Sequence, residues 1–297
     1  MQAEPEPIYP PTHHRLIIGS STAMPELADE SVQLVVTSPP YFNAPFDYEN
    51  LYPDYPTFLV MLQAMIDEVY RVLQNGRIFA LNIDDMLVDG LKYPIVADAT
   101  RMAMDAGFRY RDRIVGKKPE GYIRISRRSG VLLQHPYPMY FYPDNILESI
   151  LLFQKGKFDY KSADPERKAR SQIDTQEYQQ KKWFLSLWEM TNVLPNGPLE
   201  KNIAAFPEEL PRRIITLFSY TGDTVLDPFA GSGTTMRVAR ELHRNSIGIE
   251  IKPELARIIR QKVGVDEGQH ALLNCDDTFE VVQRTYAALS LARGPHE

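Results

Sequence analysis

Short apolar runs alternate with longer amphipathic segments along most of the chain. The runs predict buried strands, and segments with apolar residues three or four positions apart predict helices packed on a sheet. Alternating strands and helices are typical of the α/β class. The expected strands are 16–20, 32–36, 77–83, 108–116, 149–153, 225–226 and 247–250, with 149–153 antiparallel to 108–116. The expected helices are 58–73, 93–106, 207–218, 234–242 and 253–263.

The apolar run 32–36 stops at the segment Thr37-Ser38-Pro39-Pro40-Tyr41. Prolines donate no ladder hydrogen bonds, so the strand must end there, and their fixed φ makes a stiff bend. The bend brings the Ser38 hydroxyl, the backbone carbonyls and the Tyr41 ring into one small space. Such a group suits a planar, amine-bearing base that has left its stack. These residues alone fit a proline-rich turn with a core tyrosine equally well.

A second motif, 227–235, reads Asp-Pro-Phe-Ala-Gly-Ser-Gly-Thr-Thr and lies between a predicted strand and a predicted helix. Glycines there let the backbone approach a ligand closely. The motif is not a phosphate-binding P-loop, because no Gly-Lys-Ser/Thr follows. Glu250 ends the next strand, about 20 residues later, where a carboxylate can accept hydrogen bonds from ribose hydroxyls. The alternative for Glu250 is an ordinary carboxylate at a strand end.

Together with 205–213 (Ala-Phe-Pro-Glu-Glu-Leu-Pro-Arg-Arg), these two motifs resemble the amino-group DNA methyltransferases that use S-adenosylmethionine. The catalytic motif precedes the cofactor motif, which resembles the circularly permuted β group of that family. The resemblance covers most of residues 15–263. It implies a doubly wound, Rossmann-like methyltransferase sheet, mostly parallel with one antiparallel strand.

The resemblance also assigns roles to individual residues and names S-adenosyl-L-methionine as the cofactor. The implied catalytic residues are Ser38, Pro39, Pro40 and Tyr41. Serine rather than aspartate at position 38 favours transfer to cytosine N4, with adenine N6 as the alternative. The implied cofactor-binding residues are Ser20, Thr37, Phe206, Pro207, Glu209, Asp227, Phe229, Ala230, Gly231, Ser232, Gly233, Thr234, Thr235, Glu250, Ile251 and Lys252.

Within this cofactor set, the resemblance places Glu250 at the ribose and Pro207 and Glu209 at the amino-acid end. Ser20 stands where the family usually has an aspartate that contacts the adenine side. The segment 274–276 (Asn-Cys-Asp) is a lower-ranked candidate for that contact. The chain also has Asn202 where the family often has a histidine.

The net charge of −6 is unusual for a DNA-binding protein, but the charge is unevenly distributed. Residues 101–130 contain nine Lys or Arg and three acids. A basic stripe on an acidic body is compatible with phosphate contact on one face, although a solvated charged loop explains it too. The predicted DNA-binding residues are Arg113, Lys117, Lys118, Arg124, Arg127 and Arg128. We expect segments 117–145, basic and then aromatic, and 155–200 to be DNA-contacting insertions, with the polar part 155–182 as a loop.

Composition sets the remaining expectations. Residues 1–14 are rich in proline and predict a flexible arm with His13 and His14 in a solvated turn, and 15–297 predict a single catalytic domain. A single cysteine, Cys275, fits a reducing cytoplasm, and the six histidines show no metal-ligand spacing. No apolar run reaches the length of a membrane span.

The expected function is therefore site-specific methylation of double-stranded DNA, with a cognate restriction endonuclease and a homodimer as further expected partners. A non-catalytic DNA-binding subunit is the alternative of a different class, and RNA or protein amine methylation stays open. A nicotinamide dehydrogenase is disfavoured, because the third glycine of the dinucleotide motif is missing.

Overall fold

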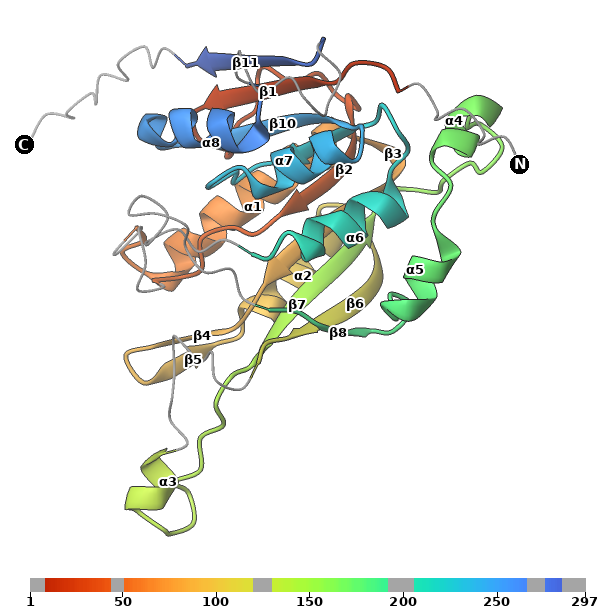
Figure 1. Cartoon of the computed structure of the whole chain (residues 1–297). Coiled ribbons are helices and arrows are strands. Elements are labelled where there is room, and N and C mark those ends of the chain that lie inside the picture. The colour runs from red at the N-terminus through yellow and green to blue at the C-terminus, as the bar shows by residue number, and fades with distance from the viewer. Residues whose placement is uncertain (1–8, 44–50, 120–129, 192–205, 266–275, 285–297) are drawn as a thin grey trace, which may run out of the picture.

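The computed structural model describes residues 9–43, 51–119, 130–191, 206–265 and 276–284. Nine strands form one sheet in the order β11-β1-β10-β9-β2-β3-β7-β6-β8 (Figure 1). β7 is antiparallel to both its neighbours, β3 and β6, and the other neighbouring pairs are parallel. The expected sheet with one antiparallel strand is thus confirmed. The strands are β1 (His13–Ile18), β2 (Val32–Thr37), β3 (Leu73–Ile83), β6 (Arg109–Lys117), β7 (Leu147–Gln154), β8 (Leu187–Glu189), β9 (Thr224–Asp227), β10 (Asn245–Glu250) and β11 (Thr278–Gln283).

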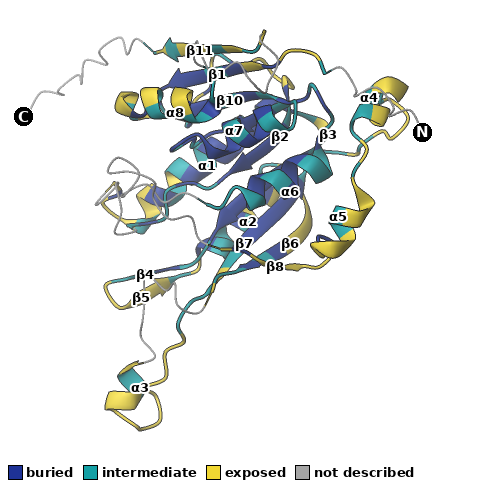
Figure 2. Ribbon diagram, viewed as in Figure 1, coloured by how far each residue is buried: buried dark blue, intermediate teal, exposed yellow. Residues whose placement is uncertain are grey.

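Helices cover both faces of this sheet. In Figure 1, α1 (Tyr55–Val72) and α2 (Ile95–Asp105) lie behind it, and α6 (Glu209–Phe218), α7 (Thr234–Glu241) and α8 (Ala256–Val263) lie in front. Successive residues of a strand point to opposite faces, so Val35 joins the core under α1 and α2 while Leu34 and Val36 join the core under α6. Most residues of the central strands β2, β3, β9 and β10 are buried (Figure 2).

The boundaries of these elements follow local signals. α1 begins three residues before its expected start, because Asp54 caps it by accepting a hydrogen bond from the Thr57 N–H at 2.8 Å. Gly76 lies inside β3, four residues after the end of this helix. Its φ of +83° and the Phe158 backbone, 2.7 Å from where a Cβ would stand, explain the glycine.

Several elements were not predicted. The hairpin of β4 (Met86–Val88) and β5 (Leu91–Tyr93) is one, and the edge strand β11 is another. The polar segment 155–182, expected to be a loop, contains α4 (Pro165–Arg170) and α5 (Thr175–Gln180), each capped by an aspartate side chain. Arg167 of α4 donates to the buried carboxylate of Asp223 at 2.5 Å, next to the start of β9. α4 therefore lies near the start of β9, at the end of the sheet opposite the carboxyl end of that strand.

The prediction of a solvated turn at His13 and His14 is wrong, because both residues belong to β1. His14 is buried and its ring bonds to the hydroxyl groups of Ser246 at 2.7 Å and Thr12 at 2.9 Å. Burial lowers the pKa of His14 to about 3, so the ring is neutral at physiological pH. Tyr9 stacks on the His243 ring, with the ring centroids 3.7 Å apart, so Tyr9 as well as 12–14 of the expected arm contacts the body.

Residues 130–146, which include α3 (Gly130–Gln134), project from the body as an arm (Figure 1). The arm leaves the sheet between the end of β6 and the start of β7. Its exposed large apolar side chains are Leu133, Tyr137, Met139, Tyr140, Phe141 and Tyr142.

Candidate active site

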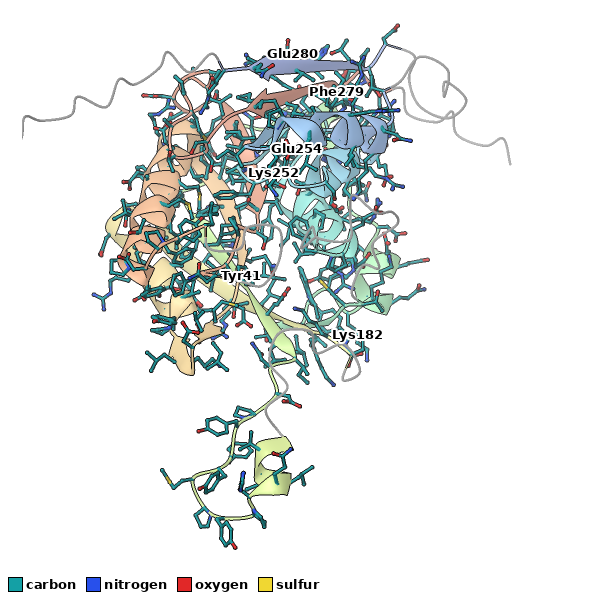
Figure 3. All side chains as sticks on the ribbon, turned by 90° about the vertical axis from the view of Figure 1, so that its left-hand side faces the viewer. Tyr41, Lys182, Lys252, Glu254, Phe279 and Glu280 are labelled. Atoms are coloured by element: carbon teal, nitrogen blue, oxygen red, sulfur yellow. The ribbon has the colours of Figure 1, made fainter. Side chains whose placement is uncertain are left out.

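The parallel strands end along one edge of the sheet, and the predicted site residues gather there. Ser20 follows β1, Thr37 ends β2, Asp227 ends β9 and Glu250 ends β10. Figure 3 looks onto this edge and shows Tyr41 and Lys252 on it. The carboxyl ends of the strands in an open α/β sheet are where ligands of this fold type bind.

The catalytic motif and the glycine turn are joined by one buried hydrogen bond. The Thr37 hydroxyl donates to Asp227 Oδ1 at 2.7 Å, and the same oxygen accepts from the Phe229 N–H at 3.1 Å. Burial, the largest cause, raises the pKa of the Asp227 carboxyl to about 7, and the negative charge of Glu250 adds to the rise. A cation bound nearby would stabilise the ionised form of this buried carboxyl.

Glu250 holds the glycine turn in place. Its Oε2 accepts from the Gly231 N–H at 3.0 Å, and its Oε1 accepts from the Lys252 N–H at 2.9 Å. Gly233 has a φ of +83°, and a Cβ there would lie 2.9 Å from Ile259 Cγ2. The turn therefore needs a glycine at position 233 for both its backbone conformation and the space beside α8.

The surroundings of this turn fit a nucleoside cofactor. Ile251 follows the Glu250 carboxylate and exposes 54% of its surface, and Phe229 is partly exposed. Gly19, just before Ser20, donates its N–H to the Glu250 carbonyl at 2.9 Å. The set thus combines a ribose-type acceptor, apolar surface for a base and a buried carboxyl suited to a positive charge. Ala230, Ser232, Thr234 and Thr235 are buried within the turn and the first residues of α7.

The side chains of the catalytic motif converge on an asparagine from the next strand. Asn82 of β3 is buried, and its Nδ2 lies 3.3 Å from Ser38 Oγ and 3.4 Å from the Tyr41 hydroxyl. Pro39 is buried, and Ser38 and Tyr41 are partly buried. Burial of the hydroxyl and the nearby Glu148 carboxylate raise the pKa of Tyr41 well above its ordinary value, so the phenol stays protonated.

Four polar residues around this motif were not predicted from the sequence. Asn82 and Asp84 lie at the end of β3, and Glu148 lies in β7, where it pairs with Lys118. Asn145 donates a hydrogen bond to Asp84, whose pKa is raised to about 6 chiefly by burial. The available signal for two of them was the polar sequence 82–85 (Asn-Ile-Asp-Asp) at the end of an apolar strand.

The residues before α6 lie beside this group. Pro207 lines a small cavity together with Asn82, Glu148 and Lys118. Glu209 accepts from Arg213 Nε at 2.9 Å, and Phe206 packs against the core under α6. The segment predicted to close the amino-acid end of the cofactor thus lies next to the catalytic motif.

The predicted DNA-binding residues are only partly described. Arg113 is exposed on β6, and Lys117 ends that strand at the same cavity. Lys118 forms an ion pair with Glu148, which places it in the site rather than on the open surface. Arg124, Arg127, Arg128, Asn202, Asn274 and Cys275 lie outside the described residues.

A glycine turn held by a strand-end carboxylate and tied to a Ser-Pro-Pro-Tyr motif at the same edge of the sheet is the arrangement expected of an S-adenosyl-L-methionine-dependent methyltransferase. The DNA methylase family model matches residues 32–261. The chain belongs to this family, and its cofactor is S-adenosyl-L-methionine. Within the described residues, no His, Cys, Asp and Glu group could hold a metal ion, and no helix could span a membrane.

Comparisons with individual proteins agree with this assignment. The chain is 36% identical to the type II methyltransferase M.MjaI of Methanocaldococcus jannaschii, over 92% of this chain and 97% of that one. It is 31% identical to M.MthZI of Methanothermobacter thermautotrophicus, over 85% and 77% of the two chains. The structure of a putative DNA modification methylase from Thermus thermophilus, complexed with S-adenosyl-L-methionine, has a TM-score of 0.67 at 27% identity, over 91% and 99%. The cytosine-N4-specific PvuII DNA methyltransferase, at 21% identity and a TM-score of 0.62 over 88% and 89%, shares the fold.

Proposed function

We propose that this DNA methyltransferase transfers a methyl group to the exocyclic N4 amine of a cytosine flipped out of double-stranded DNA. The observation that carries the proposal is the convergence of Ser38 and Tyr41 on Asn82, one residue away from the Thr37–Asp227 bond. This arrangement connects the residues proposed to bind the target base, Ser38 and Tyr41, with the glycine turn proposed to bind the cofactor. A serine at position 38 supports cytosine as the target, and adenine N6 is the alternative that the experiment below distinguishes.

The target amine is a weak nucleophile, because its lone pair is delocalised into the ring. In the proposed mechanism its two N–H groups donate to Ser38 Oγ and to the Pro39 carbonyl oxygen, which draws the nitrogen toward sp³ geometry. Pro40 keeps the bend stiff, and the Tyr41 ring stacks on the flipped base. The cofactor supplies an electrophilic methyl group when bound, so the protein must supply position and electrostatics. Serine is no strong base, and water takes the proton after methyl transfer.

The same proposal gives the cofactor-binding residues their roles. Glu250 accepts hydrogen bonds from the ribose hydroxyls in addition to those from the Gly231 and Lys252 N–H groups. Phe229 and Ile251 offer apolar surface to the adenine. The backbone of the turn, 230–235, lies along the methionine portion of the cofactor, and Ser20 contacts the adenine side of the cofactor.

At the other end of the cofactor, Phe206, Pro207 and Glu209 enclose the amino-acid group. Pro207 is close enough to the catalytic motif to share a cavity with Asn82. The cofactor would therefore lie between the glycine turn and the start of α6, with its methyl group toward Ser38.

DNA binding is assigned to the surface around the end of β6. Arg113 and Lys117 contact phosphates, together with Arg124, Arg127 and Arg128. The described part of the arm, 130–146, has no Lys or Arg and exposes aromatic rings, which suits contact with bases rather than phosphates. Of segment 155–200, the part around α4 lies at the far edge of the sheet, so we assign DNA contact to the part after α5. A cognate restriction endonuclease and a homodimer complete the proposal, the former supported by the type II relatives.

The test uses purified protein, methyl-labelled S-adenosyl-L-methionine and mixed-sequence duplex DNA, with the DNA digested to nucleosides and resolved by mass spectrometry. Label in N4-methylcytosine is the expected result. Label in N6-methyladenine would show that the target base is adenine rather than cytosine, and the proposed mechanism would still apply. Bound cofactor without label in DNA would point to another substrate or to a non-catalytic subunit.

A further inference from the structure

Glu148 supplies a negative charge next to a catalytic motif that has none of its own. Its Oε2 lies 3.4 Å from Asn82 Nδ2, and its Oε1 pairs with the Lys118 ammonium. Its side chain is 19% exposed, and its charge raises the pKa of Tyr41. Glu148 comes from β7, more than 100 residues after Ser38, and no motif contains it.

Asn82 connects this carboxylate to the motif. The amide nitrogen has two hydrogens and faces three oxygens, those of Ser38, Tyr41 and Glu148. An ionised carboxylate can only accept hydrogen bonds, so Glu148 requires that the nitrogen, and not the oxygen, of the Asn82 amide face this group. The Asn82 nitrogen then also faces the two hydroxyl groups.

This orientation determines how Ser38 can bind a substrate. One lone pair of Ser38 Oγ accepts from Asn82, and its hydroxyl hydrogen bonds with Tyr41. The second lone pair remains to accept an N–H from the target amine. If the Asn82 amide were reversed, its oxygen would attract the Ser38 hydrogen and also face the Glu148 carboxylate at close range.

We propose that Glu148 is a positioning residue that acts through Asn82 and keeps Ser38 an acceptor toward the target amine. Its charge also offsets the positive charge that the amine nitrogen gains when the N–C bond forms and the C–S bond breaks, with the C–S electron pair going to sulfur. The nitrogen loses this charge when its proton passes to water. The inference rests on the proposed transfer to an exocyclic amine and applies to cytosine N4 and adenine N6 alike.

The test compares Glu148→Gln with Glu148→Asp in steady-state methylation of duplex DNA. Glutamine keeps the size and shape of the side chain but removes its charge. Aspartate keeps the charge, but its shorter side chain loses packing contacts. We expect kcat of E148Q to fall by about tenfold to hundredfold, with unchanged cofactor affinity by calorimetry, and E148D to retain more activity than E148Q. Glu280→Gln is the matched control and keeps wild-type kinetics, because it removes an exposed, ion-paired carboxylate on β11, outside the proposed site and DNA surface.

The split between kcat and KM separates this role from simple structural support. We expect kcat of E148Q to fall while its KM for DNA stays near the wild-type value, and the shorter carboxylate of E148D to restore part of kcat. The charged groups around Glu148 are Lys118 and Asp84, and Lys117 lines the same cavity.

E148Q at least as active as E148D, or a loss in E148Q that is confined to KM, would overturn the inference. A wild-type protein that labels no DNA would refute the proposed function itself. The two failures are therefore distinguishable.

Discussion

The buried carboxyl of Asp227 should make the stability of the protein depend on pH in an unusual direction. Its pKa is raised from 3.8 to about 7, and a tenfold change in proton affinity corresponds to about 1.4 kcal/mol. The folded state therefore binds a proton between about pH 4 and pH 7 that the unfolded chain has released. The free energy of unfolding contributed by this group falls as pH rises through that window, by about 4 kcal/mol in all.

Asp227→Asn removes the titration and keeps an oxygen that can accept from the Thr37 hydroxyl and the Phe229 N–H. The assay is urea unfolding at a series of pH values, followed by the fluorescence of the buried Trp183 and Trp188. The difference in unfolding free energy, variant minus wild type, should increase from pH 4 to pH 7 by up to about 4 kcal/mol. Because the variant serves as the reference, contributions from other titrating groups cancel.

The control is Asp29→Asn, which removes the same formal charge from a side chain that is 75% exposed. Its difference from wild type should stay below about 0.5 kcal/mol at each pH, as for most surface substitutions. A difference for D227N that is constant across the range would refute the reasoning, since it would mean that burial leaves the Asp227 carboxyl as acidic as in the unfolded chain.

Three further predictions concern the cofactor turn and the arm. Glu250→Gln replaces one acceptor oxygen by a donor opposite the Gly231 or Lys252 N–H, and cofactor affinity measured by calorimetry should fall at least about tenfold. Gly233→Ala forces a Cβ to within 2.9 Å of Ile259 at a φ of +83°, and should lower the free energy of unfolding by about 1–3 kcal/mol. Tyr137→Ser on the arm should weaken binding to duplex DNA several-fold in a gel-shift assay while cofactor affinity stays unchanged.

Each of these has a result that would contradict it. Wild-type cofactor affinity in E250Q would show that the carboxylate does not organise the turn. An unchanged melting temperature in G233A would show that α8 moves to accommodate the added Cβ without loss of stability. Equal DNA affinity for Y137S and the wild type would remove the arm from the DNA interface.

The parts of the site that were predictable come from residues next to each other in sequence at strand ends. Thr37 and Ser38 stand in one motif and Asp227 and Gly231 in another, and each motif has a backbone reason for its composition. A site of this kind can be predicted from the sequence, because the residues that end the strand are also residues of the site.

The residues that were missed lie outside the two motifs. Asn82 stands in the polar end of β3 and Glu148 near the start of β7, and only the antiparallel pairing of these two strands shows that they meet. β11 is a six-residue strand at the edge of the sheet. α4 and α5 carried cap signals at Asp164 and Asp174, but with no apolar face they gave no helical periodicity.

The single antiparallel strand has a consequence for how target recognition could be changed. Because β7 runs opposite to β6, the chain leaves the sheet at Lys117 and returns at Leu147 on the same edge, beside the catalytic motif. Closing a longer loop between two fixed points costs only about 0.6 kcal/mol for each doubling of its length. The part 119–144, which leaves Lys118 and Asn145 in place, can therefore be exchanged between relatives without altering strand register. On our proposal that this segment contacts DNA, such a chimera would keep its chemistry while acquiring another protein's choice of sequence.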